Sequence, residues 1–597
     1  MKKILLGNEA IVQGAMEAGV NFVSTYPGTP ASEIGNTFAK IAKEQGVYPV
    51  KSGVAGAPPQ AEQFNRVYFE FSTNEKVALE AAIGASFSGL KCLVAMKSFG
   101  LNVASDALLP LCYTGTKGPM VIVVADDPSC WSSGQSEQNS RAFAYLAHIP
   151  ILEPSDAQEA KDFTILAFEI SEQFNSPVIL RTTTRVSHQR MPVDVNYELL
   201  ASNASRSDAG GGIKNYEFGS GFIKNPEQFC VMPNRVLEMK KKLLEKIESI
   251  RKFAEKSNIN KIEKASGKMG LSRRSPQGAK VGIIVSGVSY LYVKEAMEKL
   301  NLDLPILKLG FFYPLPTKKI ENFIKNLKKV LVVEELDPYL EKEIKILAKS
   351  GNCKLEIFGK DFLPEIGELN FEKVAFAVSK IVGKKYVLSK AISVDLPNRS
   401  PRLCPNCPYW VVFGAVKRAA PAGTIFGGDI GCYMMAGFAP HNLQDYLLCM
   451  GSSVSVAHGI EKASSFAKAS ADKPEGKKKI ISFMGDSTFF HSGIPALINA
   501  VFNKSNQLII IMDNRITAMT GHQPNPGMGK TGMGETVPEI SIEKIARACG
   551  VENIKTIEGG VVSEFESVIK EFLSKEGVSI IIAKQVCALL AKRLNKK

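Results

Sequence analysis

Asp486 and Asn514 are the residues of this chain whose types and spacing most clearly suggest chemistry. Each follows an apolar, β-branched run, in KIISFMGDS and LIIIMDN. Such runs predict buried parallel strands, and α/β sheets place ligands at the carboxyl ends of these strands. The interval between the two residues is what one βαβ crossover needs. Carboxylate, amide and backbone carbonyl oxygens suit Mg²⁺, so we predict a magnesium site that holds a diphosphate.

The turn Gly485-Asp486-Ser487 resembles the Gly-Asp-Gly signature of thiamine-diphosphate (ThDP) enzymes, with Ser487 in place of the second glycine. A Gly-Asp turn after a strand is common, so the turn alone indicates little. Asn514 at the expected distance makes a cofactor site the favoured interpretation. The resemblance assigns Gly485, Asp486, Ser487, Asn514 and Ile516 to cofactor binding. Of these, it assigns Asp486, Asn514 and a backbone carbonyl at Ile516 to Mg²⁺.

Length and composition limit the class of protein. The 597 residues are too many for one core and predict three or four domains. Hydrophobic residues make up 45% and charged residues 22%, which is typical of soluble globular proteins. No apolar run approaches the ~20 residues that span a bilayer, and the start MKKILLGNEA is a poor signal peptide. We therefore expect a cytoplasmic protein without a membrane partner.

The formal net charge is +14, and much of the excess lies in residues 240–280. The favoured interpretation of this segment is a solvated helical linker. The alternative is a surface that attracts an acidic protein such as a ferredoxin. The segment has a single aromatic residue, Phe253, and no known nucleic-acid-binding module, so we expect no nucleic-acid partner.

The pattern along the chain predicts four segments. Residues 1–195 alternate helical patterns with short strands such as KCLVAMK and PMVIVVADD, which predicts an α/β layer with a mostly parallel sheet. Residues 196–278 contain GGG at 210–212 and a Lys/Glu-rich stretch, which predict a loop and an exposed helix. Residues 279–390 form a second α/β unit. Residues 391–597 contain the motif above, with a predicted surface loop at 464–479.

Glu75 is a candidate for a second contribution that ThDP needs, a carboxylate hydrogen-bonded to the aminopyrimidine ring. It lies in the first turn of a helix predicted in NEKVALEAAIGASFSG. A carboxylate there also complements the helix dipole. The residue type alone favours this helix-stabilising role over a contact with the cofactor.

Four of the eleven cysteines are placed so that they could bind a metal. Cys404 and Cys407 form a C-x-x-C between prolines, Cys432 lies in GDIGCY, and Cys587 follows the last predicted strand. Four thiolates on loops and strand ends can ligate one [4Fe–4S] cluster. A zinc site or a redox-active pair remain alternatives. We expect the other seven to be packing residues: Cys92, Cys112, Cys130, Cys230, Cys353, Cys449 and Cys549.

Several longer segments resemble the alpha subunits of indolepyruvate:ferredoxin oxidoreductases, a family of 2-oxoacid:ferredoxin oxidoreductases. They include YPGTPASE (26–33), MKSFGLNVASDAL (96–108), SEQNSR (136–141), LCPNCP (403–408), GDIGCY (428–433) and DNRITAMTGHQPNPG (513–527). The resemblance covers almost the whole chain. It implies an α/β fold with two doubly wound ThDP-binding domains, pyrimidine-binding (1–195) and diphosphate-binding (391–597). A connector (196–278) and a transketolase-C-like α/β domain (279–390) would lie between them.

The resemblance also implies roles for single residues. Glu75 would contact the aminopyrimidine, while Thr29 and Arg141 would contact the 2-oxoacid, since a guanidinium can bind a carboxylate through two bonds. The simpler alternatives are a turn residue for Thr29 and a surface ion pair for Arg141. His491 and His522 flank the metal motif and could transfer protons, or be structural. Cys404, Cys407, Cys432 and Cys587 would hold one proximal [4Fe–4S] cluster.

The activity implied is oxidative decarboxylation of an arylpyruvate with coenzyme A, giving arylacetyl-CoA, CO₂ and reduced ferredoxin. The partners implied are a small beta subunit and ferredoxin, or a separate ferredoxin-like subunit. Two other functions remain open: a non-oxidative ThDP-dependent 2-oxoacid decarboxylase, and a non-catalytic subunit that keeps the fold.

The chain departs from the family pattern in two places. Asn406 and Tyr409 replace the usual glycine and histidine of the CPGCPH segment. The sequence ends at Lys597, shortly after Cys587, without the ferredoxin-like module that usually follows. We therefore expect electrons to leave through a separate subunit or directly to ferredoxin.

Overall fold

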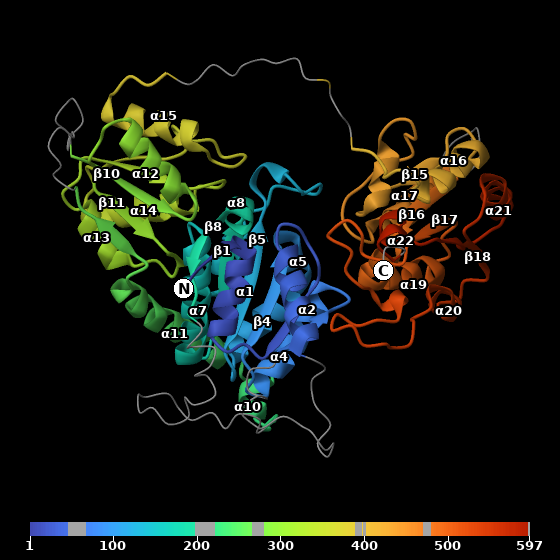
Figure 1. Cartoon of the computed structure of the whole chain (residues 1–597), viewed down its shortest axis with the longest axis horizontal. Coiled ribbons are helices and arrows are strands. Elements are labelled where there is room, and N and C mark those ends of the chain that lie inside the picture. The colour runs from blue at the N-terminus through green and yellow to red at the C-terminus, as the bar shows by residue number, and fades with distance from the viewer. Residues whose placement is uncertain are drawn as a thin grey trace. The chain divides into compact units, whose positions relative to one another are not determined.

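The computed structural model describes residues 1–45, 67–196, 221–265, 280–387, 397, 401–469 and 479–594, without side chains at 465–469. The chain divides into two compact units, residues 1–393 and 394–597 (Figure 1). The predicted loop at 210–212 and most of the predicted loop at 464–479 lie outside the described residues.

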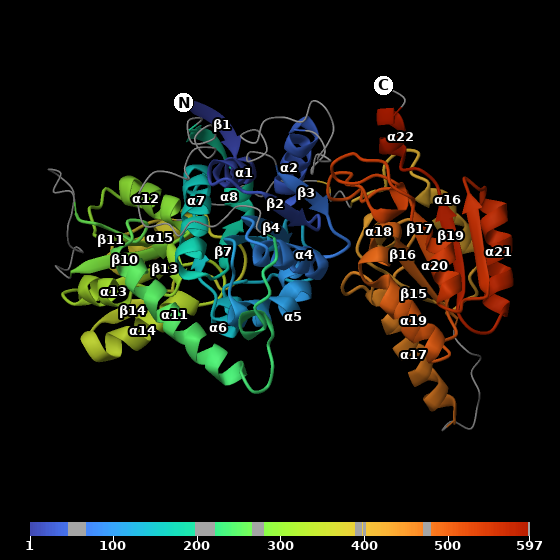
Figure 2. The same cartoon turned by 90° about the horizontal axis from the view of Figure 1, so that it is seen from below.

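A seven-stranded sheet forms the first part of the N-terminal unit (Figure 2). Its order is β12-β6-β7-β5-β4-β2-β3, and all neighbours are parallel except β12 with β6. All residues of β5 are buried, as expected of a strand covered on both faces. The strands are β2 (Phe22–Thr25), β3 (Tyr68–Phe71), β4 (Cys92–Lys97), β5 (Met120–Asp126), β6 (Ile151–Leu152), β7 (Val178–Thr183) and β12 (Phe311–Tyr313).

Helices connect these strands and cover the sheet, as the alternating sequence pattern predicts. Helices α1 and α7 pack against each other, and so do α4 and α5. A short antiparallel pair, β1 (Lys2–Leu6) with β8 (Arg190–Asp194), joins the two ends of this region. The helices are α1 (Gly7–Glu17), α2 (Ser32–Gln45), α4 (Glu75–Phe87), α5 (Ser98–Thr114), α6 (Ala142–Ala147), α7 (Ala157–Phe174) and α8 (Thr184–His188).

The Lys/Glu-rich segment forms the predicted helix, α11 (Val236–Lys256), after the short α10 (Pro226–Phe229). One stripe of α11 is buried: Met239, Leu243, Ile247, Ile250 and Ala254. This spacing is that of one face of an amphipathic helix. The helix packs against α5, α7 and α13 (Thr317–Ile324), so it is a packed element of the unit with one charged face.

A second, five-stranded sheet has the order β14-β13-β10-β11-β9. Alternate residues of β10 enter opposite apolar layers, because successive strand side chains point to opposite faces. Ile283 packs with α12 and α15, whereas Ile284 packs with α13 and α14. The elements are β9 (Lys261–Glu263), β10 (Val281–Ser286), β11 (Ile306–Leu309), β13 (Lys329–Val333), β14 (Glu356–Phe358), α12 (Ser289–Lys299), α14 (Tyr339–Gly351) and α15 (Phe371–Val382).

Two strands cross the domain boundaries that the sequence suggested. β9, from the predicted connector 196–278, pairs with β11 of the second sheet. β12, from the predicted domain 279–390, pairs with β6 of the first sheet. The division of the unit at 195 and 278 therefore stays a prediction. The second sheet includes a strand of the predicted connector, and the first sheet includes a strand of the predicted domain 279–390.

The C-terminal unit contains one parallel sheet of order β15-β16-β17-β19-β18. Helices α16 and α21 cover one face of it, and α17, α19 and α20 cover the other. The elements are α16 (Tyr409–Ala419), β15 (Ile425–Gly427), η2 (Cys432–Gly437), α17 (Ser452–Ala469), β16 (Ile480–Gly485), α18 (Asp486–Thr488), η3 (Phe489–Gly493), α19 (Ile494–Phe502), β17 (Leu508–Asp513), η4 (Pro526–Met528), α20 (Ile542–Ala548), β18 (Asn553–Glu558), α21 (Val562–Ser574), β19 (Ser579–Lys584) and α22 (Ala588–Leu594).

Among the described residues, no helix has the length and apolar character that crossing a membrane requires.

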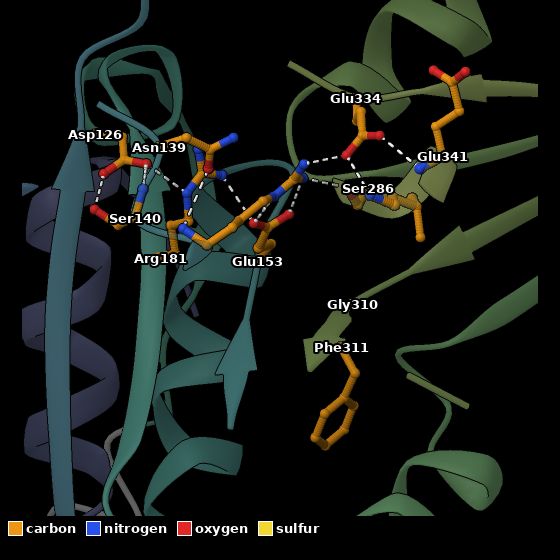
Figure 3. A network of polar contacts seen from close by, with 12 residues as sticks. Asp126, Asn139, Ser140, Glu153, Arg181, Ser286, Gly310, Phe311, Glu334 and Glu341 are labelled. Atoms are coloured by element: carbon orange, nitrogen blue, oxygen red, sulfur yellow. Dashed lines mark hydrogen bonds and ion pairs between the residues drawn. The ribbon is translucent and has the colours of Figure 1, made fainter. Parts of the chain in front are cut away.

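A buried ion network joins the two sheets of the N-terminal unit. We call it the joint network: Asp126, Arg141, Glu153, Arg181, Ser286 and Glu334. Figure 3 shows Glu334 and Ser286 from the second sheet facing Glu153 and Arg181 from the first. Arg141 donates to Glu153 at 2.7 and 2.6 Å, to Glu334 at 2.7 Å and to the Ser286 hydroxyl at 2.7 Å. Arg181 donates to Asp126 at 2.7 Å and to Glu153 at 2.9 Å.

Charge pairing sets the protonation of this network. Burial alone would raise the pKa of Glu153, but Arg141 and Arg181 hold it at about 2. Burial raises the pKa of Glu334 despite Arg141, and its carboxylate also accepts the backbone N–H groups of Leu340 and Glu341. Ion pairs at this depth are costly to break, because the remaining partner stays buried and uncompensated.

We expect Arg141→Leu to lower the free energy of unfolding of the N-terminal unit by about 3–5 kcal/mol, because Glu153 and Glu334 would lose their shared cation. Urea unfolding measures the loss. The matched control is Arg185→Leu, since Arg185 pairs with Glu368 across the same joint but is about half exposed. The control should cost about 1 kcal/mol or less. Equal losses in both variants would contradict a structural role for the buried network.

Candidate cofactor and substrate site

The two predicted metal-binding residues lie at neighbouring strand ends. β16 and β17 are parallel, with Gly485 opposite Met512, so Asp486 and Asp513 follow in adjacent positions. Asp486 is buried, and its carboxylate accepts the Ser487 N–H and the Asn525 amide, both at 2.9 Å. The side-chain oxygen of Asn514 accepts the Ile516 N–H at 3.1 Å. The structure thus brings Gly485, Asp486, Ser487, Asn514 and Ile516 to one edge of the sheet.

Two carboxylates lie together at this edge, and the Arg515 guanidinium lies 3.8 Å from the Asp513 carboxylate. Burial, and next the charge of Asp513, raise the pKa of Asp486 to about 7. Burial likewise raises the pKa of Asp513, although Arg515 opposes the shift. Buried like charges of this kind are stabilised by a cation, and the donors are the hard oxygens that Mg²⁺ prefers. Asp513 and Asn525 were not predicted as site residues, although the Asp-Asn dipeptide at the strand end was a signal for Asp513.

The chain after Asp486 turns through α18 and a π-helical turn, η3, before α19 begins. Single π-turns are frequent at functional sites. Gly485 is required before this turn, because a Cβ added there would lie 2.7 Å from the Tyr433 ring. His491 lies buried in η3, with its Nδ1 3.0 Å from the Ser492 hydroxyl. Proton transfer by His491 stays a prediction.

The four candidate metal-binding cysteines lie in the C-terminal unit. Cys404 and Cys407 share a turn that leads into α16, with the Cys407 N–H donating to the Cys404 carbonyl at 3.1 Å. Cys432 begins η2, and Cys587 lies between β19 and α22. Burial raises the pKa of Cys407 to about 11 and of Cys432 to about 12, and in both cases the charges of the other candidate cysteines raise it further.

These thiols are therefore close enough to repel one another when ionised. In the described part of the chain, however, no three His, Cys, Asp or Glu side chains are arranged to hold a metal ion. The donor chemistry suits iron or zinc, and the choice of a [4Fe–4S] cluster stays a prediction. Of the other seven cysteines, Cys92 and Cys112 are buried as expected, but the expectation is wrong for Cys230, Cys353 and Cys449, which are exposed.

Two tyrosines connect the cysteine segments with the acidic edge. Tyr409 is buried at the start of α16, and its hydroxyl donates to the Met512 carbonyl at 3.2 Å. Its ring packs edge-on against Tyr433, with centroids 6.4 Å apart. The Tyr433 hydroxyl in turn contacts the Thr488 hydroxyl at 2.9 Å. The segments that carry Cys407 and Cys432 are thus anchored to the ends of β16 and β17.

His522 and Cys587 meet at the same edge. The Nε2 atom of His522 lies 3.8 Å from the Cys587 sulfur. The Cys587 N–H donates to the Asn514 carbonyl at 3.1 Å, which ties this cysteine to the predicted metal-binding loop. Burial, and next the charge of Arg593, lower the pKa of His522, so the imidazole is neutral at pH 7. A catalytic role for His522 stays a prediction.

Glu75 is the first residue of α4, as predicted, and Asn74 caps the helix by accepting the Val77 N–H at 2.9 Å. Glu75 is buried. Gly100 makes room for it, because a Cβ at Gly100 would lie 2.5 Å from Glu75 Cγ and 2.8 Å from its Oε1. The close packing of Glu75 against Gly100 was not predicted from the sequence.

Thr29 lies in the turn after β2, where its hydroxyl contacts that of Ser32 at 3.4 Å. Arg141 is not a surface residue, since its side chain is only 2% exposed. All three of its guanidinium nitrogens donate within the joint network. The structure therefore places Thr29 on a half-buried turn, and Arg141 in an ion network that engages all three of its guanidinium nitrogens.

Family profiles match three parts of the chain. Residues 13–257 match the pyruvate flavodoxin/ferredoxin oxidoreductase ThDP-binding domain. Residues 272–385 match the indolepyruvate oxidoreductase domain. Residues 429–583 match the C-terminal thiamine pyrophosphate-binding domain of thiamine pyrophosphate enzymes. The ThDP-binding fold class predicted for both ends of the chain is confirmed.

Three curated relatives are similar over nearly the whole chain, and each is an indolepyruvate oxidoreductase subunit IorA. The protein of Methanothermobacter thermautotrophicus is 42% identical over 98% of this chain and 87% of its own. That of Pyrococcus horikoshii is 42% identical over 98% and 86%, and that of Archaeoglobus fulgidus is 38% identical over 100% and 88%. This chain is an oxidoreductase subunit with ThDP-binding domains and belongs to the indolepyruvate oxidoreductase IorA family.

Proposed function

We propose that this chain is the catalytic alpha subunit of a ThDP- and Mg²⁺-dependent oxidoreductase that decarboxylates an arylpyruvate, with coenzyme A and ferredoxin as co-substrates. The observation that carries the proposal is the pair of buried carboxylates, Asp486 and Asp513, beside Asn514 at adjacent strand ends. In a chain of this family, two buried carboxylates at the carboxyl edge of a parallel sheet support the proposal of a cation that binds a diphosphate.

Bound ThDP supplies the carbanion chemistry of decarboxylation. The chain's own residues would hold and activate it. Asp486, Asn514 and the Ile516 carbonyl would bind Mg²⁺. Glu75, whose side chain packs against Gly100, would hold a hydrogen bond to the aminopyrimidine. Thr29 would contact the 2-oxoacid from its turn.

The proposal changes the role of Arg141. Its position in the family pattern suggested a direct contact with the 2-oxoacid. Because its nitrogens are occupied in the joint network, we propose that Arg141 acts as a positioning residue for the loop that precedes it. The partners proposed are a small beta subunit and ferredoxin or a ferredoxin-like subunit.

A non-oxidative ThDP-dependent decarboxylase, the alternative that the sequence left open, would release carbon dioxide without passing electrons to an acceptor. Viologen reduction separates the two functions. The anaerobically purified complex of this chain with its small subunit should reduce the dye when indolepyruvate or phenylpyruvate and coenzyme A are added. Carbon dioxide release without dye reduction would support the decarboxylase.

Metal-dependent ThDP binding should weaken as the pH falls from 8 to 6. The pKa of Asp486 is raised to about 7, so its carboxylate takes up a proton in this range, and Mg²⁺ needs the ionised form. We expect an affinity loss of about tenfold over this range, measured by isothermal titration. Asp486→Asn should bind ThDP weakly at both pH values, and Asp445→Asn, in the same unit, should behave as the wild type. An affinity that does not change with pH in the wild type would contradict the assignment.

Glu75→Gln should slow hydrogen–deuterium exchange at C2 of bound ThDP by about 10²–10⁴-fold, the usual contribution of a positioned acid–base group. ThDP affinity should stay within a few-fold of the wild type. Exchange is followed by acid quench and NMR. The control is Glu80→Gln, on the exposed side of the same helix, where Glu80 pairs with Lys76. Unchanged exchange in Glu75→Gln would remove Glu75 from the mechanism.

Anaerobically purified wild type should contain about four iron and four sulfide per chain if the cysteines hold one [4Fe–4S] cluster. Cys404→Ser should lose most of both, because serine is a poor ligand for this cluster. Cys449→Ser is the control, an exposed cysteine of the same unit. Zinc in place of iron, or full iron content in Cys404→Ser, would contradict the cluster.

A further inference from the structure

Lys97 lies where three strand ends of the first sheet meet. It is the last residue of β4, which lies between β2 and β5. The turn that carries Thr29 follows β2. Gly28 in this turn permits the approach of Lys97, because a Cβ on Gly28 would lie 2.8 Å from the Lys97 Cβ. Thr29 and Lys97 therefore belong to neighbouring segments at the carboxyl edge of the sheet.

The loop after β5 closes over the Lys97 side chain. The ammonium group donates to the Ser132 carbonyl at 3.0 Å and lies 4.9 Å from the centre of the Phe99 ring. The Ser132 hydroxyl shares its single proton between the Asp127 carboxylate at 3.0 Å and the Thr29 carbonyl at 3.3 Å. Lys97 and Thr29 are thus linked through one residue of this loop.

The charge of Lys97 has no ion-pair partner among the described residues. Asp127 is the nearest acid that acts on it. The Asp127 carboxylate, however, accepts hydrogen bonds from three hydroxyl groups and one backbone N–H: Ser132, Ser133, Thr184 and the N–H of Ser132. An ammonium has three donors, and the described residues provide one acceptor for it, the Ser132 carbonyl. The other two donors have no acceptor in the part of the chain that the structure describes.

Burial dominates the electrostatics of Lys97. It lowers the pKa of Lys97 to about 8, although Asp127 and the Cys130 thiol act in the opposite direction. Burial raises the pKa of the Cys130 thiol, and next the charges of Glu137 and Asp127 raise it, whereas Lys97 acts in the opposite direction. Lys97 is therefore mostly protonated at pH 7, in a position where water compensates its charge only partly.

We propose that the Lys97 ammonium binds the carboxylate of the 2-oxoacid substrate, beside the Thr29 hydroxyl. This inference rests on the proposed function and extends it, since it names the cation that contacts the substrate. The unpaired charge of Lys97 and its link to Thr29 support it. Arg141, the cation that the family pattern suggested for this role, has its guanidinium nitrogens engaged in the joint network. A carboxylate bound to Lys97 would complete its hydrogen bonds and neutralise its charge.

The first test compares steady-state kinetics of the complete complex with its small subunit. Lys97→Met should raise the KM for the 2-oxoacid by about tenfold or more, which corresponds to the free energy of one charge-assisted hydrogen bond. The kcat should fall much less, and the KM for coenzyme A should not change. Lys97→Arg should restore most of the affinity for the 2-oxoacid.

The pH profile gives a second readout. An amine with a pKa near 8 loses its charge above that pH, so the wild-type KM for the 2-oxoacid should rise as the pH passes from 7 to 9. In Lys97→Arg the KM should stay low over this range, because arginine stays protonated. In Lys97→Met it should be high and flat.

Lys117 provides the matched control. Its ammonium is buried and has no hydrogen-bond partner among the described residues, but Lys117 precedes β5, at the opposite edge of the same sheet. Lys117→Met should leave both KM values unchanged. Bound ThDP is quantified in each variant, to confirm that the fold is intact.

Chemical labelling tests the contact without turnover. The wild-type complex is acetylated briefly with and without phenylpyruvate, and peptides are quantified by mass spectrometry. The 2-oxoacid should protect Lys97 and leave Lys117 labelled equally in both samples. Equal labelling of Lys97, an unchanged KM in Lys97→Met, or an increase confined to the KM for coenzyme A would each overturn the inference. A wild-type complex that reduces no dye would instead refute the proposed function, and the labelling result would still decide the role of Lys97.

Discussion

Burying a charge costs free energy unless an opposite charge or several hydrogen bonds surround it, and this requirement distinguishes the charged clusters of the chain. In the joint network the chain supplies both signs, and each guanidinium faces carboxylates. At the ends of β16 and β17 it supplies mainly one sign, since Asp486 lies beside Asp513. Lys97 is the opposite case, a cation without a carboxylate partner in the described chain. A cluster in which the charges pair stabilises the fold, whereas charged groups without a partner of opposite sign are candidates for ligand binding.

The presence or absence of carboxylate partners distinguishes Arg141 from Lys97, although both are simply cations in the sequence. Arg141 has a planar group that binds two carboxylates at once, and the structure uses all of it to connect two sheets. Lys97 has a flexible side chain with one hydrogen bond to the protein. In the same way, the Tyr409–Tyr433 pair has a supporting function: it anchors the cysteine segments to the strand ends that carry the acidic pair. The Tyr409 side chain is buried, so the departure from the family pattern that the sequence suggested at this position concerns an internal contact.

The sequence predicted the features that depend on local pattern. The β-branched runs became β4, β5, β7, β10, β13, β16 and β17, and Asp486 and Asn514 lie at their ends because parallel strands must end together at one edge. Glu75 lies in the first turn of its helix, as the sequence predicted. The partners of Arg141 could not be predicted, because Glu334 lies far along the chain and no local pattern encodes that pairing. The same holds for Gly100 and Lys97, whose roles depend on which side chains the fold places against them.

The antiparallel strand β12 has a consequence for how the chain is made. It completes the edge of the first sheet beside β6, yet it comes from a segment more than a hundred residues later. During synthesis β6 therefore has an open edge until residues 311–313 have left the ribosome, and an open edge can pair with another chain. A fragment that ends near residue 195 would keep this edge permanently. The smallest fragment suited to separate expression is for this reason the whole N-terminal unit, including both of its sheets.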